Sequence, residues 1–174
     1  VRATTTQFIF ASTGGAIYGE QDSFPADETH AIRPKCPYGV SKRCAEQYLE
    51  YYGRCSSLRT LSMRFANVYG PRQNPKGEAG VVAIFTDRLL KGLPLTVNGD
   101  GQQTRDFVYV GDVVQAILEA GGRKSPAEFD VYNVGRGVET SVTEVVETLS
   151  RVWKDLGQEA ASLIVNHGPA MPGE

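Results

Sequence analysis

Two residues four positions apart, Tyr38 and Lys42, form the pattern in this sequence that is best suited to acid–base chemistry. Four residues is slightly more than one turn of an α-helix, so both side chains would project from the same face. A lysine ammonium beside a phenol favours the phenolate, which makes Tyr38 a candidate general base near neutral pH. Thr13 follows an apolar run and adds a hydroxyl that can hydrogen-bond the same substrate oxygen. Together the three side chains could move a proton on and off a sugar hydroxyl.

A Tyr-x-x-x-Lys pair also arises by chance, and the alternative interpretation is an ordinary half-buried helix tyrosine followed by a solvated lysine. The surrounding residues favour a helix that presents the pair. Pro34 and Pro37 would end the preceding segment and allow a helix to begin at Tyr38. Apolar residues then recur at helical spacing to about Tyr52, and Gly53 is a suitable C-terminal stop.

Short apolar strands are predicted at residues 7–11 and 58–65, one on each side of this helix. Strand, helix and strand in this order predict parallel strands with a right-handed crossover. Residues 19–37 are polar and punctuated by proline, which predicts a loop. Further along the chain, the pattern predicts helices at 81–91, 112–120 and 141–156 and strands at 95–98, 105–110 and 131–134.

The clearest helix start in the sequence is the capping box formed by Ser141 and Glu144. Trp153 belongs to the apolar stripe of that helix and is expected in a core rather than on a ligand, and Gly157 would end the helix. Asp112 is the expected N-cap of the preceding helix, at residues 112–120. A turn at residues 99–101 is expected to join two of the strands.

The sequence resembles the extended short-chain dehydrogenase/reductase family, and within it the nucleotide-sugar epimerases of the UDP-glucose 4-epimerase type. Thr13, Tyr38 and Lys42 match the family's Ser/Thr–Tyr–Lys triad. Residues 61–72 resemble the strand and loop that hold the sugar nucleotide, and residues 99–114 resemble the substrate-domain signature. The resemblance covers nearly the whole chain, with several motifs in the family's order.

The resemblance implies an α/β fold, in which the second half of a Rossmann-like parallel sheet joins a small α/β substrate-binding lobe. Residues 1–70 would form the C-terminal part of the NAD-binding domain, and residues 71–174 would form mostly the substrate lobe, intertwined with the sheet. The family holds the cofactor pyrophosphate on a Gly-rich turn, and no such turn stands in these 174 residues. We therefore expect the sequence to be the middle and C-terminal part of a longer, N-terminally truncated enzyme.

The resemblance also implies roles for the candidate residues. Tyr38 would remove the proton from a sugar hydroxyl as hydride passes from that carbon to NAD, and the hydride would later return to the opposite face. Lys42 would support the phenolate and hydrogen-bond the nicotinamide ribose, and Thr13 would orient the reacting oxygen. Ala11 and Phe65 match positions beside the cofactor.

On the substrate side, the resemblance implies a nucleotide-sugar partner, expected to be a UDP-hexose. Asn67 would donate to the diphosphate and Arg105 would pair with it, a geometry that suits phosphate oxygens. Further positions would line the nucleotide: Val81, Thr96 and Asn98. The alternatives are a turn residue at Asn67 and an ion pair between Arg105 and a neighbouring aspartate.

Residues Gly14, Gly15 and Ala16 favour 4-epimerisation, because related 4,6-dehydratases carry an Asp-Glu pair after the threonine and related decarboxylases a glutamate. Met171 stands where the family often has an arginine that clamps the diphosphate, so weak substrate affinity is expected. Two alternatives stay open. The chain is an inactive fragment or interaction module, or it is a dehydratase or reductase relative. The family is commonly homodimeric, and truncation is expected to alter that association.

The composition argues against a nucleic-acid-binding protein, a membrane-spanning protein and a metalloprotein. The net charge of −2 gives no electrostatic footprint for nucleic acid, and no apolar run approaches the length of a membrane span. Three cysteines without metal-site spacing, Cys36, Cys44 and Cys55, indicate reduced thiols in a cytoplasmic protein. His30 and His167 are isolated in the sequence, so no metal site is expected.

Overall fold

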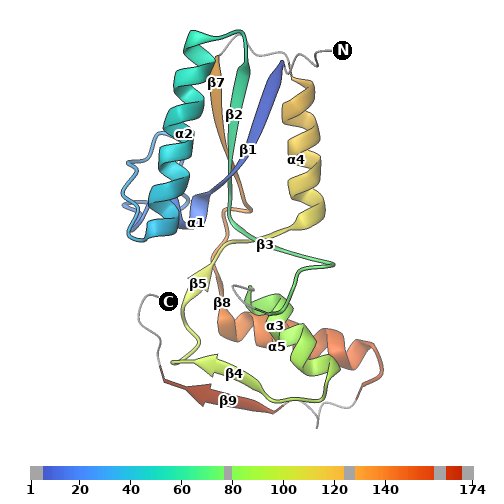
Figure 1. Cartoon of the computed structure of the whole chain (residues 1–174). Coiled ribbons are helices and arrows are strands. Elements are labelled where there is room, and N and C mark those ends of the chain that lie inside the picture. The colour runs from blue at the N-terminus through green and yellow to red at the C-terminus, as the bar shows by residue number, and fades with distance from the viewer. Residues whose placement is uncertain (1–5, 77–79, 124–127, 159–163, 170–174) are drawn as a thin grey trace. The chain divides into compact units, whose positions relative to one another are not determined.

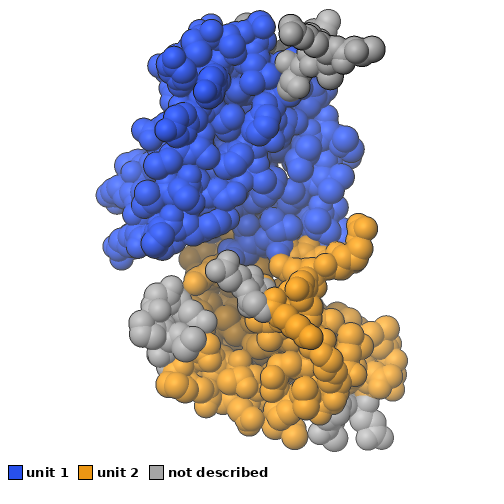
Figure 2. Space-filling model, in the orientation of Figure 1, with its two compact units in different colours: residues 1–68, 108–137 blue, residues 69–107, 138–174 orange. Residues whose placement is uncertain are grey.

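The computed structural model describes most of the chain, in the ranges 6–76, 80–123, 128–158 and 164–169 (Figure 1). The chain divides into two compact units, coloured separately in Figure 2. Unit 1 comprises residues Val1–Val68 and Val108–Gly137, and unit 2 comprises residues Tyr69–Phe107 and Val138–Glu174.

Unit 1 is built on a three-stranded parallel sheet in the order β1-β2-β7. The strands are β1 (Gln7–Thr13), β2 (Arg59–Phe65) and β7 (Phe129–Val134). Helix α2 (Pro37–Cys55) covers one face of this sheet and α4 (Val110–Gly122) covers the other (Figure 1). The strand–helix–strand unit predicted around Tyr38, with its parallel strands, is confirmed.

The two faces of β2 differ in chemistry, because successive side chains of a strand point to opposite sides. Leu61 and Met63 pack with Ala120 of α4 in a buried apolar cluster. Ser62 and Arg64 alternate with them and are bonded to α2. The face of the sheet under α2 is therefore polar, although it is buried.

The described residues of unit 2 form two short sheets and two helices. Strand β4 (Leu95–Asn98) pairs in parallel with β9 (Val165–Gly168), and β5 (Thr104–Arg105) pairs antiparallel with β8 (Thr140–Ser141). The helices are α3 (Val81–Leu90) and α5 (Val142–Asp155). Their apolar faces enclose a core of Phe85, Leu89, Leu95, Val97, Phe107, Val142 and Val145.

Three short elements complete the described structure. Helix α1 (Gly14–Ile17) follows β1 directly, and β3 (Asn67–Tyr69) pairs with β6 (Phe107–Tyr109). None of the helices in the described residues is long and apolar enough to cross a membrane. No group of three or more His, Cys, Asp or Glu side chains in the same residues is arranged to hold a metal ion.

The helix signals of unit 2 are confirmed. Ser141 Oγ accepts from the Glu144 amide at 3.1 Å, and the Glu144 carboxylate accepts from the Ser141 amide at 2.6 Å, which is a complete capping box. Gly157 follows α5 with φ of 75°, a conformation that glycine adopts without strain. Trp153 packs against the core of unit 2, as predicted.

Two predicted helix ends are wrong. Helix α2 continues through Gly53 to Cys55, since Gly53 is a packing residue rather than a stop: a Cβ there would lie 2.5 Å from the Glu128 carbonyl oxygen. Helix α4 begins at Val110, with Tyr109 at the N-cap position but without a hydrogen bond from its side chain to the helix, so Asp112 lies in the first turn. An acidic residue in the first turn favours the helix N-terminus without capping it.

One prediction of topology is also corrected. The strands on either side of residues 99–101 do not pair with each other, because β4 pairs with β9 and β5 with β8. Residues 71–174 were expected to form mostly the substrate lobe, intertwined with the sheet, and within them helix α4 and strand β7 belong to unit 1. The reason is the pairing of β7 along β2, which places residues 108–137 on the first sheet.

Candidate active site

The Tyr-x-x-x-Lys pair lies in the first turns of α2, as predicted. Pro37 occupies the first turn, where its missing N–H costs nothing, and Cys36 caps the helix by accepting from the Gly39 amide at 3.5 Å. Tyr38 follows Pro37 directly and is 54% exposed, so its phenol is accessible to a ligand. Lys42 follows one turn later on the same helix face.

Lys42 ties this helix to strand β1. Its Nζ donates to the carbonyl oxygen of Ala11 at 2.8 Å, and it lies 4.8 Å from the ring centroid of Phe10 and 5.6 Å from that of Tyr38. A cation at these distances is attracted by the faces of both rings. The ammonium group therefore lies between the end of β1 and the tyrosine ring.

Thr13 is the last residue of β1, two positions beyond Ala11, and is 8% exposed. Asn67 lies nearby at the start of β3. A Cβ built on Gly15 would be 3.9 Å from Asn67 Nδ2 and 4.0 Å from Thr13 Oγ1, so the amide and the hydroxyl flank the same backbone segment. Phe65 ends β2 and pairs in register with Thr13.

The close packing around the pair depends on another glycine. A Cβ on Gly39 would lie 2.5 Å from the carbonyl oxygen of Ala16, which is too close for any side chain. Helix α2 therefore packs its first turn directly against the backbone of α1, the helix that follows Thr13. This contact sets how near Tyr38 comes to the end of β1.

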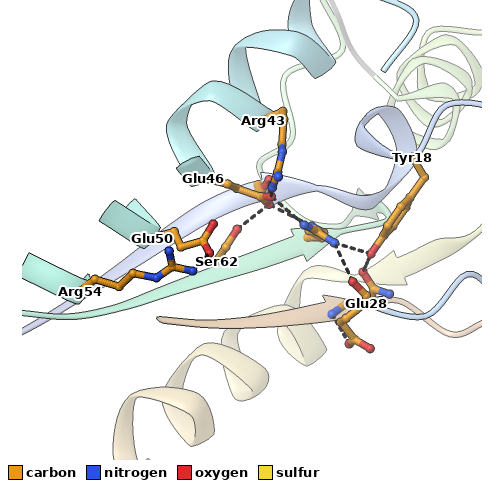
Figure 3. A network of polar contacts seen from close by, with 10 residues as sticks. Tyr18, Glu28, Arg43, Glu46, Glu50, Arg54 and Ser62 are labelled. Carbon is orange, nitrogen blue, oxygen red and sulfur yellow. Dashed lines mark hydrogen bonds and ion pairs between the residues drawn. The ribbon is translucent and has the colours of Figure 1, made fainter. Parts of the chain in front are cut away.

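Behind the pair, a buried polar network joins α2 to both neighbouring strands (Figure 3). Glu46, one turn after Lys42, is 0% exposed. Its Oε1 accepts from Ser12 Oγ at 2.7 Å, from Ser62 Oγ at 2.8 Å and from Arg64 Nε at 3.0 Å. Its Oε2 accepts from Arg64 Nη2 at 2.7 Å. Sequence reasoning missed this network; its signal was the alternation of polar and apolar residues along 60–64.

The charges of this network are held ionised. Burial by itself raises the pKa of Glu46, but the hydrogen bonds from Arg64, Ser12 and Ser62 outweigh it, so the pKa lies below the usual value. Burial lowers the pKa of Arg64, and the hydrogen bonds to Glu46 and Tyr18 reverse that effect and raise it. The pair is therefore a buried, hydrogen-bonded ion pair.

The remaining predicted substrate residues lie in unit 2. Val81 begins α3 and packs against the core, and Thr96 is exposed on β4. The backbone oxygen of Asn98 accepts from Gln103 Nε2 at 3.1 Å, and Arg105 donates to the carbonyl oxygen of Thr104 at 2.8 Å. Met171 lies outside the described residues. The structure thus places six predicted residues in unit 1: Ala11, Thr13, Tyr38, Lys42, Phe65 and Asn67. It places the other four in unit 2: Val81, Thr96, Asn98 and Arg105.

Residues 1–135 match the NAD dependent epimerase/dehydratase family. The chain belongs to this family. Among curated proteins, it is 48% identical over 143 residues to a putative UDP-glucose 4-epimerase of Methanocaldococcus jannaschii, covering 82% of this chain and 46% of the relative. A human dTDP-D-glucose 4,6-dehydratase is also similar, with 32% identity over 158 residues, covering 91% of this chain and 43% of that protein.

Solved structures of epimerases share the fold. A UDP-glucose 4-epimerase of Thermotoga maritima with UDP-glucose has a TM-score of 0.85 and 43% identity, covering 97% of this chain and 52% of that chain. The UDP-glucose 4-epimerase of Thermus thermophilus in complex with NAD has a TM-score of 0.81 and 45% identity, covering 97% and 53%. These likenesses confirm the expected α/β fold with a Rossmann-like parallel sheet. This member of the epimerase/dehydratase family spans about half the length of the relatives that it matches.

Proposed function

We propose that this chain carries the acid–base apparatus of an NAD-dependent nucleotide-sugar 4-epimerase that acts on a UDP-hexose. The observation that carries the proposal is the contact of Lys42 with both Ala11 and the Tyr38 ring, at the end of the strand that Thr13 terminates. This arrangement sets a phenol, an ammonium group and a hydroxyl at one edge of a parallel sheet. Ligands of open α/β sheets bind at that edge, outside the carboxyl ends of the strands.

In this account Tyr38 takes the proton of the sugar hydroxyl and later returns it. Lys42 stabilises the phenolate electrostatically, since its charge lies 5.6 Å from the ring centroid. Thr13 donates to or accepts from the same substrate oxygen and keeps it in line with the phenol. Thr13 is only 8% exposed, so its side chain is largely shielded from solvent.

The residues present fit the ribose end of a nicotinamide cofactor. An ammonium group has three donors, and the Ala11 carbonyl accepts one of them, which leaves donors of Lys42 for ribose hydroxyls. The exposed phenol of Tyr38 is open on the same side. When bound, NAD would supply the oxidation and re-reduction of the substrate carbon. No residue of this chain is assigned to the pyrophosphate, since no Gly-rich turn stands in the sequence.

For the substrate, we assign the diphosphate to Asn67, whose amide lies beside the Gly15 backbone near Thr13. Unit 2 is assigned the role of the substrate lobe, with Arg105 on the diphosphate. The nucleotide is assigned to the three further residues of that unit: Val81, Thr96 and Asn98. The substrate class follows from the relatives, whose names include UDP-glucose 4-epimerases.

A dehydratase is the second candidate, because a dTDP-D-glucose 4,6-dehydratase is among the relatives. Elimination of water needs an additional acid and base beside the sugar. The residues after Thr13 are Gly14, Gly15 and Ala16, none of which can transfer a proton. This segment supports epimerisation.

We also infer that the chain associates with a second copy through α2, although truncation is expected to alter the homodimer that the family commonly forms. Besides Tyr38, three tyrosines on this helix are more than half exposed: Tyr48, Tyr51 and Tyr52. Tyrosine is enriched at protein interfaces, where it supplies contact area and a hydroxyl. Sedimentation of the purified chain tests the association, and a monomer at all concentrations would contradict it.

The product formed from UDP-glucose distinguishes the candidate reactions. The chain is incubated with NAD and UDP-glucose, and the sugars are separated by chromatography. UDP-galactose is the expected product. A 4-keto-6-deoxy sugar would show a dehydratase instead, and unchanged substrate with no bound NAD would support the inactive-fragment alternative.

A further inference from the structure

The Glu46 carboxylate joins three elements of unit 1. It lies on α2, receives a hydrogen bond from Ser12 on β1, and receives bonds from Ser62 and Arg64 on β2. Arg43, three residues earlier on α2, adds an ion-pair contact at 3.6 Å. Figure 3 shows Glu46 pointing from the helix toward Ser62 on the strand below it.

This set of bonds resists sliding of α2 along the sheet. A shift by one residue moves a helix 1.5 Å along its axis, which exceeds the tolerance of a hydrogen bond. Because Glu46 is 0% exposed, no water would replace the lost donors, and its charge would be left unpaired in the interior. The bonded position is therefore strongly preferred over its neighbours.

The arginine side of the pair extends the same network. Arg64 Nη1 donates to the Tyr18 hydroxyl at 2.8 Å, and that hydroxyl donates to Asn133 Oδ1 at 2.7 Å. The backbone N–H of Asn133 in turn donates to Glu28 Oε1 at 2.7 Å. The bonds thus run from α2 across β2 and β7 to the loop that precedes the helix.

We propose that Glu46 and Arg64 are positioning residues, which set the axial position of α2 on the sheet and so hold Lys42 against Ala11 and over the Phe10 ring of β1. Lys42 lies one helical turn and Tyr38 two turns before Glu46, on the same side of a continuous helix. Ser12, which bonds Glu46, is the residue next to Thr13. The catalytic consequence of this inference rests on the function proposed above, but the geometric claim does not.

The position of Lys42 has a spectroscopic signature. Protons held over an aromatic ring resonate upfield, and Lys42 Nζ lies over the Phe10 and Tyr38 rings. The Lys42 ε-methylene protons are therefore expected upfield of those of the exposed lysines. A merely stabilising role for Glu46 would leave this displacement unchanged in any variant that still folds.

The test is a proton–carbon NMR spectrum of the chain with ¹³C-labelled lysine, without NAD or substrate. Glu46→Gln keeps the shape of the side chain but presents a donor to Arg64, and we expect it to lose most of the upfield displacement. Glu50→Gln is the matched control: it removes a carboxylate from the same helix, where Glu50 pairs with Arg54 at the surface, and should leave the displacement intact. A folded Glu46→Gln chain with the same upfield displacement as the wild type would overturn the proposal. The absence of an upfield displacement in the wild-type chain would overturn it as well.

If Glu46→Gln does not fold, Ser12→Ala is the milder variant, because it removes one of the donors to the carboxylate and leaves the ion pair. A reduced displacement is expected there, and an unchanged one would overturn the proposal. Since the spectrum requires no cofactor, an inactive chain with these shifts would contradict the proposed function alone. An active chain in which neither Glu46→Gln nor Ser12→Ala changes the Lys42 chemical shift would contradict this inference alone.

Discussion

Lys42 Nζ donates to the carbonyl oxygen of Ala11 at 2.8 Å, so the helix that carries the candidate acid–base residues is tied directly to the strand that ends at Thr13. The lysine belongs to α2 and the carbonyl to β1, which are separated by 31 positions along the chain. Since the same ammonium group also lies over the Tyr38 ring, one side chain links helix, strand and phenol. The first prediction concerns this link.

Lys42→Met keeps an apolar stem over Phe10 and removes the charge. We expect the chain to fold, since exposed and half-buried cations contribute little to stability, but 4-epimerisation should fall by about 10²- to 10⁴-fold, the usual contribution of acid–base catalysis. Initial rates with UDP-galactose and NAD give the measurement. Lys35→Met is the control, because Lys35 is more than half exposed and pairs with Glu20 at the surface; equal losses in both variants would contradict the role of Lys42.

Arg64→Met should be among the most destabilising single changes in unit 1. It leaves the Glu46 carboxylate buried without its partner, which costs about 3–5 kcal/mol of unfolding free energy. The control, Arg54→Met, breaks the surface pair with Glu50 and should cost about 0–1 kcal/mol. Urea unfolding followed by circular dichroism measures both, and similar midpoints would show that the buried pair is not required.

The pH dependence of stability follows from Glu46. Its pKa is lowered in the folded chain, so its contribution is fully present above the ordinary glutamate value, about 4.3, and is lost as the pH falls through the folded value. Unfolding midpoints measured from pH 6 downward should therefore fall less steeply for Glu46→Gln than for the wild type. Glu20, Asp27 and Glu144 also have lowered pKa values, so a residual slope is expected. Parallel curves for the two proteins would argue against an ionised Glu46.

Gly39→Ala tests the contact between α2 and α1. The added Cβ would lie 2.5 Å from the Ala16 carbonyl oxygen, so the first turn of α2 must move, and we expect a loss of about 1–3 kcal/mol together with most of the activity. The comparison is Gly122→Ala at the end of α4, where a Cβ meets nothing within 4 Å and alanine is a better helix former. If both variants unfold at the wild-type urea concentration, the close approach at Gly39 does not constrain the helix.

Much of unit 1 was predictable because its signals are local. The Tyr38 helix follows from two prolines and an apolar period, and the flanking strands follow from short apolar runs. The same holds in unit 2 for the capping box of Ser141 and Glu144, whose partners are three residues apart. Such features depend on neighbours in sequence, which a single chain displays directly.

What could not be predicted depends on tertiary contact. Glu46 and Arg64 are 18 positions apart, and the polar–apolar alternation along residues 60–64 does not identify Glu46 as the partner of Arg64. Gly53 has the sequence context of a helix stop, but it lies within the helix, where its missing side chain leaves room for the Glu128 backbone. The partner of β4 is β9 rather than the next strand, a parallel pairing that no turn signal marks.

The most direct test of the central claim is the interconversion of UDP-galactose and UDP-glucose by the chain with NAD, compared between Tyr38→Phe and Tyr48→Phe. Both changes remove one exposed phenol from α2, and Tyr48 lies away from Lys42, at 67% exposure. We predict that the wild type and Tyr48→Phe interconvert the two sugars, and that Tyr38→Phe loses at least about 10²-fold in rate. Equal rates in the two variants, or no interconversion by the wild type, would contradict the assignment of Tyr38 as the acid–base residue of an epimerase.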